Sequence, residues 1–438
     1  MIADQEPTPA DLSYPAASRR ATLPRGHQNV GPLARVTAAV TLLVALLTAG
    51  CSPSSSKPAD GATPFSPSSS TPARKVFDPP TRFDTSGRPL GTAQPGDALL
   101  YDKLAFVAGP AALAVADITT GQQLTPLAPP HPAVADQVGT QPIAHTPLLV
   151  DLNGQPAIMA PYPVTVPATG TTTARPAVDL ILADARTGQL LRTITVDTPA
   201  SDSNPTGLLS TTLVGASDTV AVLRLNTSTV AIDLATGTTR WRATDFAAAA
   251  IVGDIVLGLT TPDSRYIQAV AGYSVTDGTK HFTGPKARYP ALVPAGPSFA
   301  VLAGEQDNGN GFYALVDGDG RLHHHSTGSY GSRLRCWYDA SSITVCAFSG
   351  TQLLIALDAS SGADLWHLPA TGRQAPDVTT VWHGAVYGTA NGHPVVLDAH
   401  TGTDKQDSPG LAPVAVNGYA GIATGPYPGN LSVYPAIG

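Results

Sequence analysis

A turn motif that recurs at a nearly constant interval constrains this fold more than any other feature of the sequence. In each copy an apolar stretch leads into a turn of the Asp-x-x-Thr-Gly type, and a second short stretch follows. Their spacings are 67, 49, 41, 42, 42 and 40 residues, so the later units share a period near 41. Seven copies at one period indicate a repeat protein with an insertion in the first interval. The closing glycines are Gly121, Gly188, Gly237, Gly278, Gly320, Gly362 and Gly402.

Turn chemistry explains the residues of this motif. Glycine suits a position where the backbone takes positive φ, and the leading aspartate can accept hydrogen bonds from the N–H groups that follow it. We therefore expect a structural role and no catalytic one for the leading aspartates Asp117, Asp184, Asp233, Asp358 and Asp398.

Each unit contains four strands, because two more strand-like stretches lie upstream of each turn, such as TTLVGA and TVAVLRL before TVAIDL. Four antiparallel strands repeated every 40 to 45 residues or so are the signature of a β-propeller blade. The sequence thus predicts an all-β propeller of four-stranded antiparallel blades. Seven complete units and a partial one after Gly402 make eight blades if a strand near Arg74 to Pro79 closes the ring, with seven blades as the alternative.

Composition agrees with many short strands joined by turns. Gly 42 and Pro 41 supply 83 of the 438 residues, and only 13% are charged, against about 25% in a typical soluble domain. The net charge is −7 and no run of Lys and Arg is long enough to follow a phosphate backbone. We therefore expect no nucleic-acid partner.

Two copies of the repeat carry a family resemblance. AIDLATGTTRW with Trp241 and ALDASSGADLW with Trp366 resemble the repeat of the pyrroloquinoline-quinone (PQQ) dehydrogenase propellers, which many non-enzymatic PQQ-like propellers share. The resemblance covers roughly Gly96 to Gly438 and implies the propeller fold. Those dehydrogenases use adjacent cysteines, calcium-binding acids and an Asp base. Cys336 and Cys346 are ten residues apart and no matching acidic cluster is present, so we expect no PQQ or other cofactor.

The amino-terminal region resembles a bacterial lipoprotein signal. Arg35 precedes fifteen uncharged residues, VTAAVTLLVALLTAG, and small residues lead to Cys51. The stretch is shorter than the roughly 20 apolar residues of a spanning helix and fits a signal h-region. We expect a signal peptide with a long leader over 1–50, a lipidated Cys51 and Ser/Pro-rich linker over 51–80, and the propeller over 81–438. A plain signal peptide or anchor with an incidental Cys51 is the alternative.

The lipoprotein-like signal predicts a protein anchored by lipid on the extracytoplasmic face of the cell membrane. The Ala, Thr, Pro and Gly usage is typical of a high-GC Gram-positive (actinobacterial) source. With Cys51 lipidated, Cys336 and Cys346 remain as one pair. RLRCWYDASSITVCAF is read as a hairpin centred on Ser341, which places the two cysteines opposite each other, and an oxidising exterior favours the bond. Two buried free thiols are the alternative.

Long loops mark one face of the predicted ring, because the second-to-third-strand loops and the connections between blades emerge on the same side. The long segments are LAPPHPAVADQVGTQPIAHTP, VTVPATGTTTARPA, TTPDSRY, GEQDNGNG and TGPYPGN. Loops carry function more often than the scaffold does. The candidate ligand or partner contacts in them are Arg175, Asp263, Arg265, Tyr266, Glu305, Asp307, Asn310 and Tyr427.

No metal site is expected. Glu305 to Asn310 and the turn with Asp317 and Asp319 lie at opposite ends of a strand over 311–316 and lack the twelve-residue EF-hand pattern. The three histidines 323–325 alternate faces on a strand, so at most two could converge. Hydrolase, phosphate-loop and dinucleotide motifs are missing from the sequence. The leading hypothesis is a binding or scaffold module for a small ligand or an envelope protein; a quinone-dependent or hydrolytic propeller enzyme is the alternative.

Overall fold

The computed structural model describes residues 75–93, 95–134, 137–138, 141–142, 146–198, 211–328, 334–348, 352–425 and 430–438. By its internal contacts the chain divides into Met1–Ser70 and Thr71–Gly438, and every described residue lies in the second unit. In these residues the one helical element is the single 3-10 turn η1 (Pro95–Asp97), and no helix is long and apolar enough to cross a membrane. Cys51, with the expected signal peptide and most of the linker, lies outside the described residues.

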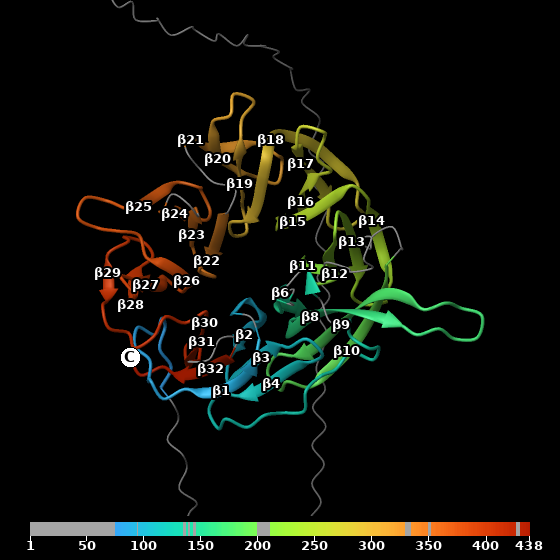
Figure 1. Ribbon diagram of the computed structural model, residues 1–438, viewed down its shortest axis with the longest axis horizontal. Coiled ribbons are helices and arrows are strands. Elements are labelled where there is room, and N and C mark those ends of the chain that lie inside the picture. Colours follow the sequence, from blue (N-terminus) through green and yellow to red (C-terminus); the bar gives the residue numbers. More distant parts are fainter. Residues whose placement is uncertain are drawn as a thin grey trace, which may run out of the picture. The chain divides into compact units, whose positions relative to one another are not determined.

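Antiparallel blades succeed one another around the ring in Figure 1, with the first strand of each blade toward the centre and the last at the rim. Blade 1 comprises β2 (Ala98–Tyr101), β3 (Leu104–Ala108) and β4 (Leu113–Asp117), and the isolated bridges Ala116↔Gln123 and Leu113↔Leu127 extend its outer edge. The small hairpin β5 (Gln137–Val138) and β6 (Gln141–Pro142) follows. Blade 2 comprises β7 (Leu148–Leu152), β8 (Gln155–Val166), β9 (Arg175–Asp184) and β10 (Leu190–Asp197). Blade 3 comprises β11 (Thr211–Ala216), β12 (Val220–Leu225), β13 (Ser228–Asp233) and β14 (Thr239–Ala243).

Blades 4 and 5 share one long strand. The first three strands of blade 4 are β15 (Phe246–Val252), β16 (Ile255–Thr260) and β17 (Ile267–Ser274). β18 (Lys280–Pro294) pairs with β17 along its first half and with β19 along its second, so a seven-stranded sheet runs through both blades. Blade 5 continues with β19 (Ala300–Glu305), β20 (Gly311–Val316) and β21 (Leu322–Thr327).

The remaining three blades are separate sheets. Blade 6 comprises β22 (Leu334–Tyr338), β23 (Ile343–Phe348), β24 (Leu353–Asp358) and β25 (Asp364–Leu368). Blade 7 comprises β26 (Asp377–Trp382), β27 (Ala385–Ala390), β28 (His393–Asp398) and β29 (Asp404–Gln406). Blade 8 comprises β30 (Ala415–Val416), β31 (Ala420–Thr424), β32 (Asn430–Pro435) and, from the other end of the chain, β1 (Arg88–Thr92). The predicted propeller with eight blades is therefore present.

The strand that closes the ring is not the one expected. β1 (Arg88–Thr92) pairs with β32, whereas the segment near Arg74 to Pro79 forms no strand in its described part. Pro79 and Pro80 offer no N–H for a ladder, and Phe77 instead donates its N–H to the Gly418 carbonyl at 2.9 Å. β1 tolerates Pro89 because it is the outer edge strand of its blade.

Apolar side chains fill every interface between neighbouring blades. The described core separates into eight clusters, each drawn from the facing sides of two adjacent blades. One of them joins Ile422 and Leu431 of blade 8 to Ala105 and Val107 of blade 1. The interface between the last blade and the first is thus packed like the others, which closes the ring.

The repeated turns are built as their sequence predicts. Asp233 Oδ1 accepts the N–H groups of Ala235 and Thr236 at 3.0 and 2.8 Å, and Gly237 has φ of 76°. The Thr236 N–H and the Arg240 guanidinium, which both stabilise the carboxylate, lower the pKa of Asp233 to about 2. The other leading aspartates make the same bonds, which confirms their structural role.

In four of the repeats the residue four positions after the turn glycine contacts the next blade. Trp241 donates its Nε1–H to the Val275 carbonyl at 2.8 Å, and a Cβ on Gly278 would lie 2.6 Å from its ring. Trp366 makes the equivalent bond to the Ala399 carbonyl at 2.8 Å and covers Gly402. Phe282 covers Gly320 in the same way, and Arg192 donates to the Leu234 carbonyl at 2.6 Å. In these two copies without tryptophan, another side chain therefore makes the contact.

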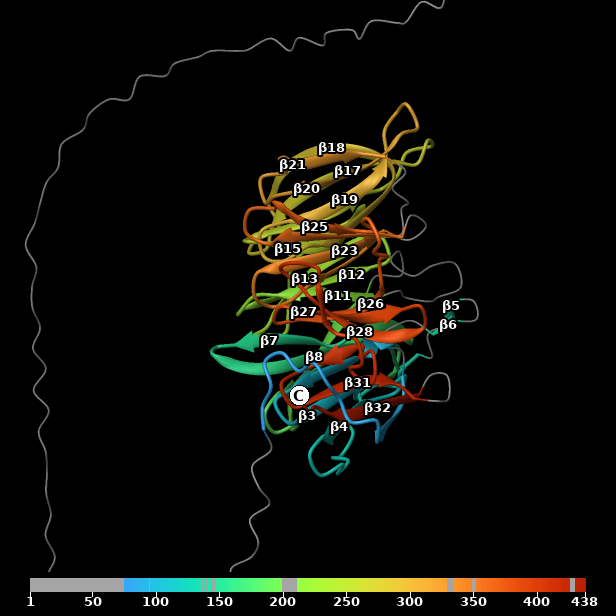
Figure 2. The same cartoon turned by 90° about the vertical axis from the view of Figure 1, so that its left-hand side faces the viewer.

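The two faces of the ring carry different connections. Because the strands alternate in direction, the first-to-second and third-to-fourth turns lie on one face, here called the turn face. The second-to-third loops and the connections between blades lie on the other, the loop face, from which β5 and β6 project in the side view of Figure 2. The described chain begins on the turn face, where Phe77 bonds to Gly418 and His383 Nδ1 lies 2.5 Å from Asp78 Oδ1.

Candidate functional site

The sequence-derived candidates on blades 4 and 5 lie together at the loop face. Tyr266 follows β16 and stacks on Tyr289 of β18, with ring centroids 5.2 Å apart, and both rings are exposed, at 57% and 42%. The Arg288 guanidinium lies 4.9 Å from the centroid of the Tyr289 ring. We call Asp263, Arg265, Tyr266, Arg288 and Tyr289 the tyrosine patch.

The tyrosine patch satisfies its own polar groups. Asp263 accepts the N–H groups of Ile267 and Arg265 at 2.9 and 2.8 Å, and these bonds, with the nearby Arg265 guanidinium at 3.5 Å, hold the pKa of Asp263 below its usual range. Tyr266 and Tyr289 have φ of 62° and 48°, a conformation that costs a residue other than glycine about 1–3 kcal/mol. The Tyr289 N–H donates to the Tyr266 carbonyl at 3.1 Å, so the two strained residues support each other.

The other candidates do not join this patch by any bond described here. Glu305 ends β19 opposite Arg288, and Asp307 and Asn310 belong to the turn from β19 to β20, which is closed by the Asn310 N–H on Asn308 Oδ1 at 2.9 Å. Arg175 begins β9 and forms an ion pair with Asp197 of the same blade. Tyr427 lies outside the described residues.

Part of the insertion between blades 1 and 2 has a structural role. The Val134 N–H donates to the Pro163 carbonyl at 2.9 Å, which holds the insertion along β8. His131 Nδ1 lies 3.1 Å from Oδ2 of the fully buried Asp179, and the Thr195 hydroxyl donates to Oδ1 at 2.7 Å. The buried carboxylate is therefore hydrogen-bonded on both oxygens, as burial of a charge requires.

The acidic residues and histidines considered as metal ligands lie apart in the described structure. Asp307 and Asp317 lie at the two ends of β20, and no group of three or more Asp, Glu, His or Cys side chains in the described part of the chain is placed to hold a metal ion. His323 Nε2 lies 2.6 Å from Asp317 Oδ2, and the side chains of His324 and His325 lie outside those described. The cysteines form a cross-strand bond instead of an adjacent pair.

A cavity that the sequence did not indicate opens between blades 6 and 7. Its volume is about 840 Å³, inside the range of about 300–1,000 Å³ that ligand sites occupy. We call it the blade 6–7 groove. It lies at the loop face, where β22 and β24 begin, β23 ends, and β26 and β27 of blade 7 begin and end, respectively. The lining residues are Leu334, Arg335, Trp337, Ala347, Phe348, Gln352, Leu353, Leu354, Gln374, Ala375, Pro376, Asp377, Val378, Thr389, Ala390 and Asn391.

The polar side chains of this groove form no hydrogen bonds or ion pairs with the described residues around them. In the part of the chain that the structure describes, no residue provides a hydrogen bond or ion pair to the side chains of Arg335, Trp337, Gln352, Gln374, Asp377 or Asn391. Arg335, Gln374 and Asn391 are exposed, whereas the apolar Trp337, Ala347 and Val378 are half-buried against the core between blades 6 and 7. The groove therefore combines an apolar floor with a rim of available donors and acceptors.

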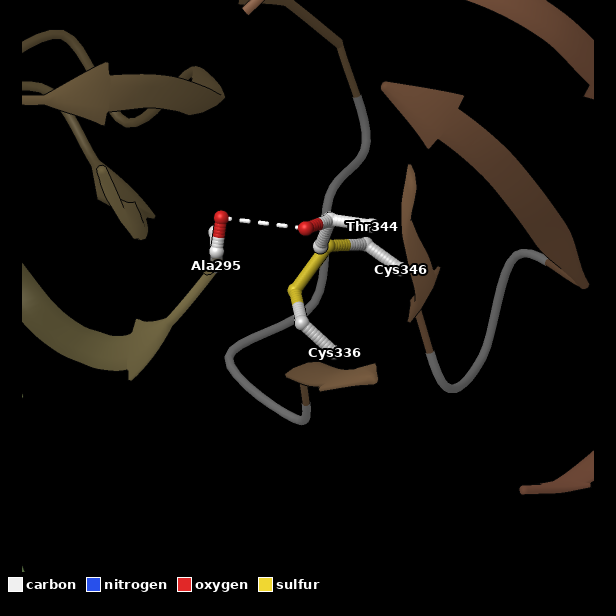
Figure 3. Close-up of a disulfide and its surroundings, with 4 residues drawn as sticks. All are labelled: Ala295, Cys336, Thr344 and Cys346. Carbon is white, nitrogen blue, oxygen red and sulfur yellow. Dashed lines mark hydrogen bonds between the residues drawn. A yellow bond between two sulfur atoms is a disulfide. The ribbon is translucent and has the colours of Figure 1, made fainter. Parts of the chain in front are cut away.

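The disulfide lies on the opposite side of the strand that carries Arg335 and Trp337. Cys336 and Cys346 face each other in the β22–β23 register, with Cα atoms 4.1 Å apart, which confirms the predicted pairing and hairpin. Figure 3 shows the bond beside Thr344, whose hydroxyl donates to the Ala295 carbonyl of blade 5 at 3.0 Å. Since side chains alternate along a strand, Cys336 points to blade 5 while Arg335 and Trp337 point to blade 7.

Comparisons with known proteins return structural similarity only. No family model matches the chain, and no curated protein matches it. Among solved structures, BamB from Moraxella catarrhalis is 13% identical, with a TM-score of 0.43 over 80% of this chain and 100% of that one. The β-propeller domain of Cps50 (Swd1) from Myceliophteria thermophila is 8% identical, with a TM-score of 0.38 over 60% and 92%. The WD40 domain of Toxoplasma gondii coronin is 8% identical, with a TM-score of 0.38 over 84% and 85%.

Proposed function

We propose that this protein is a binding module whose ligand occupies the blade 6–7 groove. The single observation that supports this is the convergence of polar side chains, including the Arg335 guanidinium, that have no bonding partner among the described residues, around a cavity of about 840 Å³ with an apolar floor. Sites that hold ligands combine an apolar surface with a few placed polar groups in this way. In the tyrosine patch, by contrast, Asp263, Arg265 and Arg288 bond to groups of the patch itself or its own loop.

The proposal includes the place where the module works. The lipoprotein-like signal before Cys51 supports an anchor in the cell membrane and an extracytoplasmic propeller of the PQQ-like type from a Gram-positive bacterium. The disulfide fits this proposal, because such bonds persist in oxidising compartments. Replacing Cys51 with Ser should release the protein from membranes; a variant that stays in the membrane fraction would exclude lipidation.

A photo-crosslinking amino acid at position 374 tests the proposed site in intact cells. Gln374 is exposed at the rim of the groove, and Ser360 on the turn face of blade 6 provides the matched control position. The proposal expects a specific adduct from position 374 and none from position 360. Adducts from both positions, or from neither, would contradict it. Adding PQQ with calcium to the purified protein and following absorbance and dye-linked oxidation tests the enzymatic alternative.

A further inference from the structure

We propose that the ligand of the blade 6–7 groove is a short extended peptide segment that places a carboxylate on Arg335. This inference rests on the proposed function, since it assigns a chemical class to the ligand of the same groove. It is argued from three features of the lining: the floor, the rim amides and the one cationic side chain.

The floor selects apolar side chains. Trp337, Ala347 and Val378 line the groove and are half-buried, and all three pack against the core between blades 6 and 7, so they present apolar surface to a ligand. Covering such a surface with a fully polar ligand would bring little gain, whereas an aliphatic or aromatic side chain removes apolar area from water on both partners. These apolar lining residues therefore favour a ligand with apolar substituents over a bare sugar or ion.

The rim amides match a peptide backbone. Gln352, Gln374 and Asn391 each offer a carbonyl acceptor and an NH₂ donor, which is the pairing that peptide groups require. A purely hydrocarbon ligand would bury these amides without partners, and an unpaired buried polar group is costly. A segment with alternating apolar side chains and free main-chain groups satisfies the floor and the rim together.

The positive charge of Arg335 at the rim favours a ligand that carries a carboxylate. Arg335 is the one Arg, Lys or His among the described lining residues, and its guanidinium has no carboxylate partner in that set. A carboxylate can bind it through two parallel hydrogen bonds, which give both strength and orientation. Asp377 lies on the blade 7 side of the same rim and can accept N–H groups of the segment. In a peptide ligand, either an Asp or Glu side chain or the free carboxyl end of the chain can supply the carboxylate that binds Arg335.

Peptide selection on the full-length protein in detergent micelles tests the assignment. A random dodecapeptide library, prepared with free and with amidated carboxyl ends, is selected against wild type, Arg335→Glu and the turn-face control Arg321→Ala. Wild type and the control should enrich Asp or Glu at one position, or the free carboxyl end alone, which separates the two sources of carboxylate. Arg335→Glu, a change at an exposed site, should switch the selection to Lys or Arg. A labelled selected peptide should bind Arg335→Ala at least about tenfold more weakly.

Three results would overturn the inference. Selected peptides that lack an acid and ignore Arg335 would refute the carboxylate, while the position-374 adduct would still uphold the groove as a binding site. Failure to select any peptide, with that adduct still formed, would refute the peptide class alone. Loss of both the selection and the adduct would refute the proposed function as well.

Discussion

The tyrosine patch and the blade 6–7 groove lie on the same face of the ring and differ in how their polar groups are used. In the patch, Asp263 bonds its own loop and Arg288 covers Tyr289, so the exposed residues are held by one another. In the groove, Arg335 and the rim amides surround a cavity without partners in the described chain. Unused hydrogen-bonding capacity around a concave surface, more than exposure, distinguishes a site that can take a ligand.

The two interfaces also differ in sheet connectivity. β18 passes from blade 4 into blade 5 and pairs with a strand of each. Blades 6 and 7 are separate sheets joined at the turn face, where Asp339 Oδ2 accepts the Gly384 N–H at 3.0 Å and Trp366 bonds to the Ala399 carbonyl. These two bonds join the blades at the face opposite the groove.

Filling the groove should have the largest effect on binding. Ala390→Trp places an indole in the cavity, and we expect at least a tenfold loss of the position-374 adduct. The double change Tyr266→Ala and Tyr289→Ala should alter it less than about twofold, as peripheral residues usually do. Quantitative blotting of the adduct measures both. If the tyrosine variant loses the adduct and the tryptophan variant keeps it, the ligand binds at the tyrosine patch and not in the groove.

Removing the disulfide should affect the groove as well as stability. Cys336→Ser with Cys346→Ser releases a crosslink worth about 3 kcal/mol for a short loop, and a large domain should lose only a few degrees in Tm. Because β22 carries Arg335 and Trp337 on its other side, groove binding should weaken while the tyrosine patch is unaffected. Calorimetry measures the Tm, and the fluorescence anisotropy of a labelled selected peptide measures binding to the groove. Native thiols that alkylate without reductant would show that the bond does not form.

A pair of glycine substitutions compares the closed and open ends of blades 6 and 7. Gly402 and Gly372 both have positive φ, at 67° and 74°, so alanine strains the backbone similarly at each. A Cβ on Gly402 would lie 2.6 Å from Trp366, whereas one on Gly372 meets nothing within 4 Å. Gly402→Ala should therefore cost about 1–3 kcal/mol more than Gly372→Ala in denaturant unfolding. Equal costs would contradict the tight turn-face contact.

Acid should act on the tyrosine patch through Asp263, with the smallest effect. The folded-state pKa of Asp263 lies below its ordinary value of 3.8, so its contribution is complete above that pH and is lost as pH falls through the lower folded value. The stability difference between wild type and Asp263→Asn should shrink over this acidic range. Urea unfolding at a series of pH values from 6 to 2 provides the measurement. A difference that grows on acidification would reverse the assigned sign.

The fold was predictable because its information is local and repeated. Each turn needs Asp and Gly within a few residues, and the hairpin around Ser341 fixed the Cys336–Cys346 register from alternation alone. The closing strand was not predictable in this way, because Arg88–Thr92 is five residues long, contains a proline and becomes a strand only against β32. Its partner is the far end of the chain.

The candidate sites were likewise predictable only where their residues are close together in the sequence. Loop length located Asp263, Arg265 and Tyr266, since a loop is a contiguous stretch of sequence. The groove is assembled from three separated segments of ordinary composition, and its space depends on how far two sheets diverge. One local signal was present: in Arg335-Cys336-Trp337, a disulfide on one side of a strand places the arginine and tryptophan together on the other.

The way the described chain enters the ring determines how a mechanical load would reach it. Before β1 the chain bonds to Gly418, Gly438 and Pro435 through the N–H groups of Phe77, Thr81 and Asp84. A pull from the amino-terminal side would have to break these bonds before it could peel β1 from β32. The residues ahead of β1 thus protect the β1–β32 pairing. Under tension their hydrogen bonds would break first, while the pairing that closes the ring stays intact.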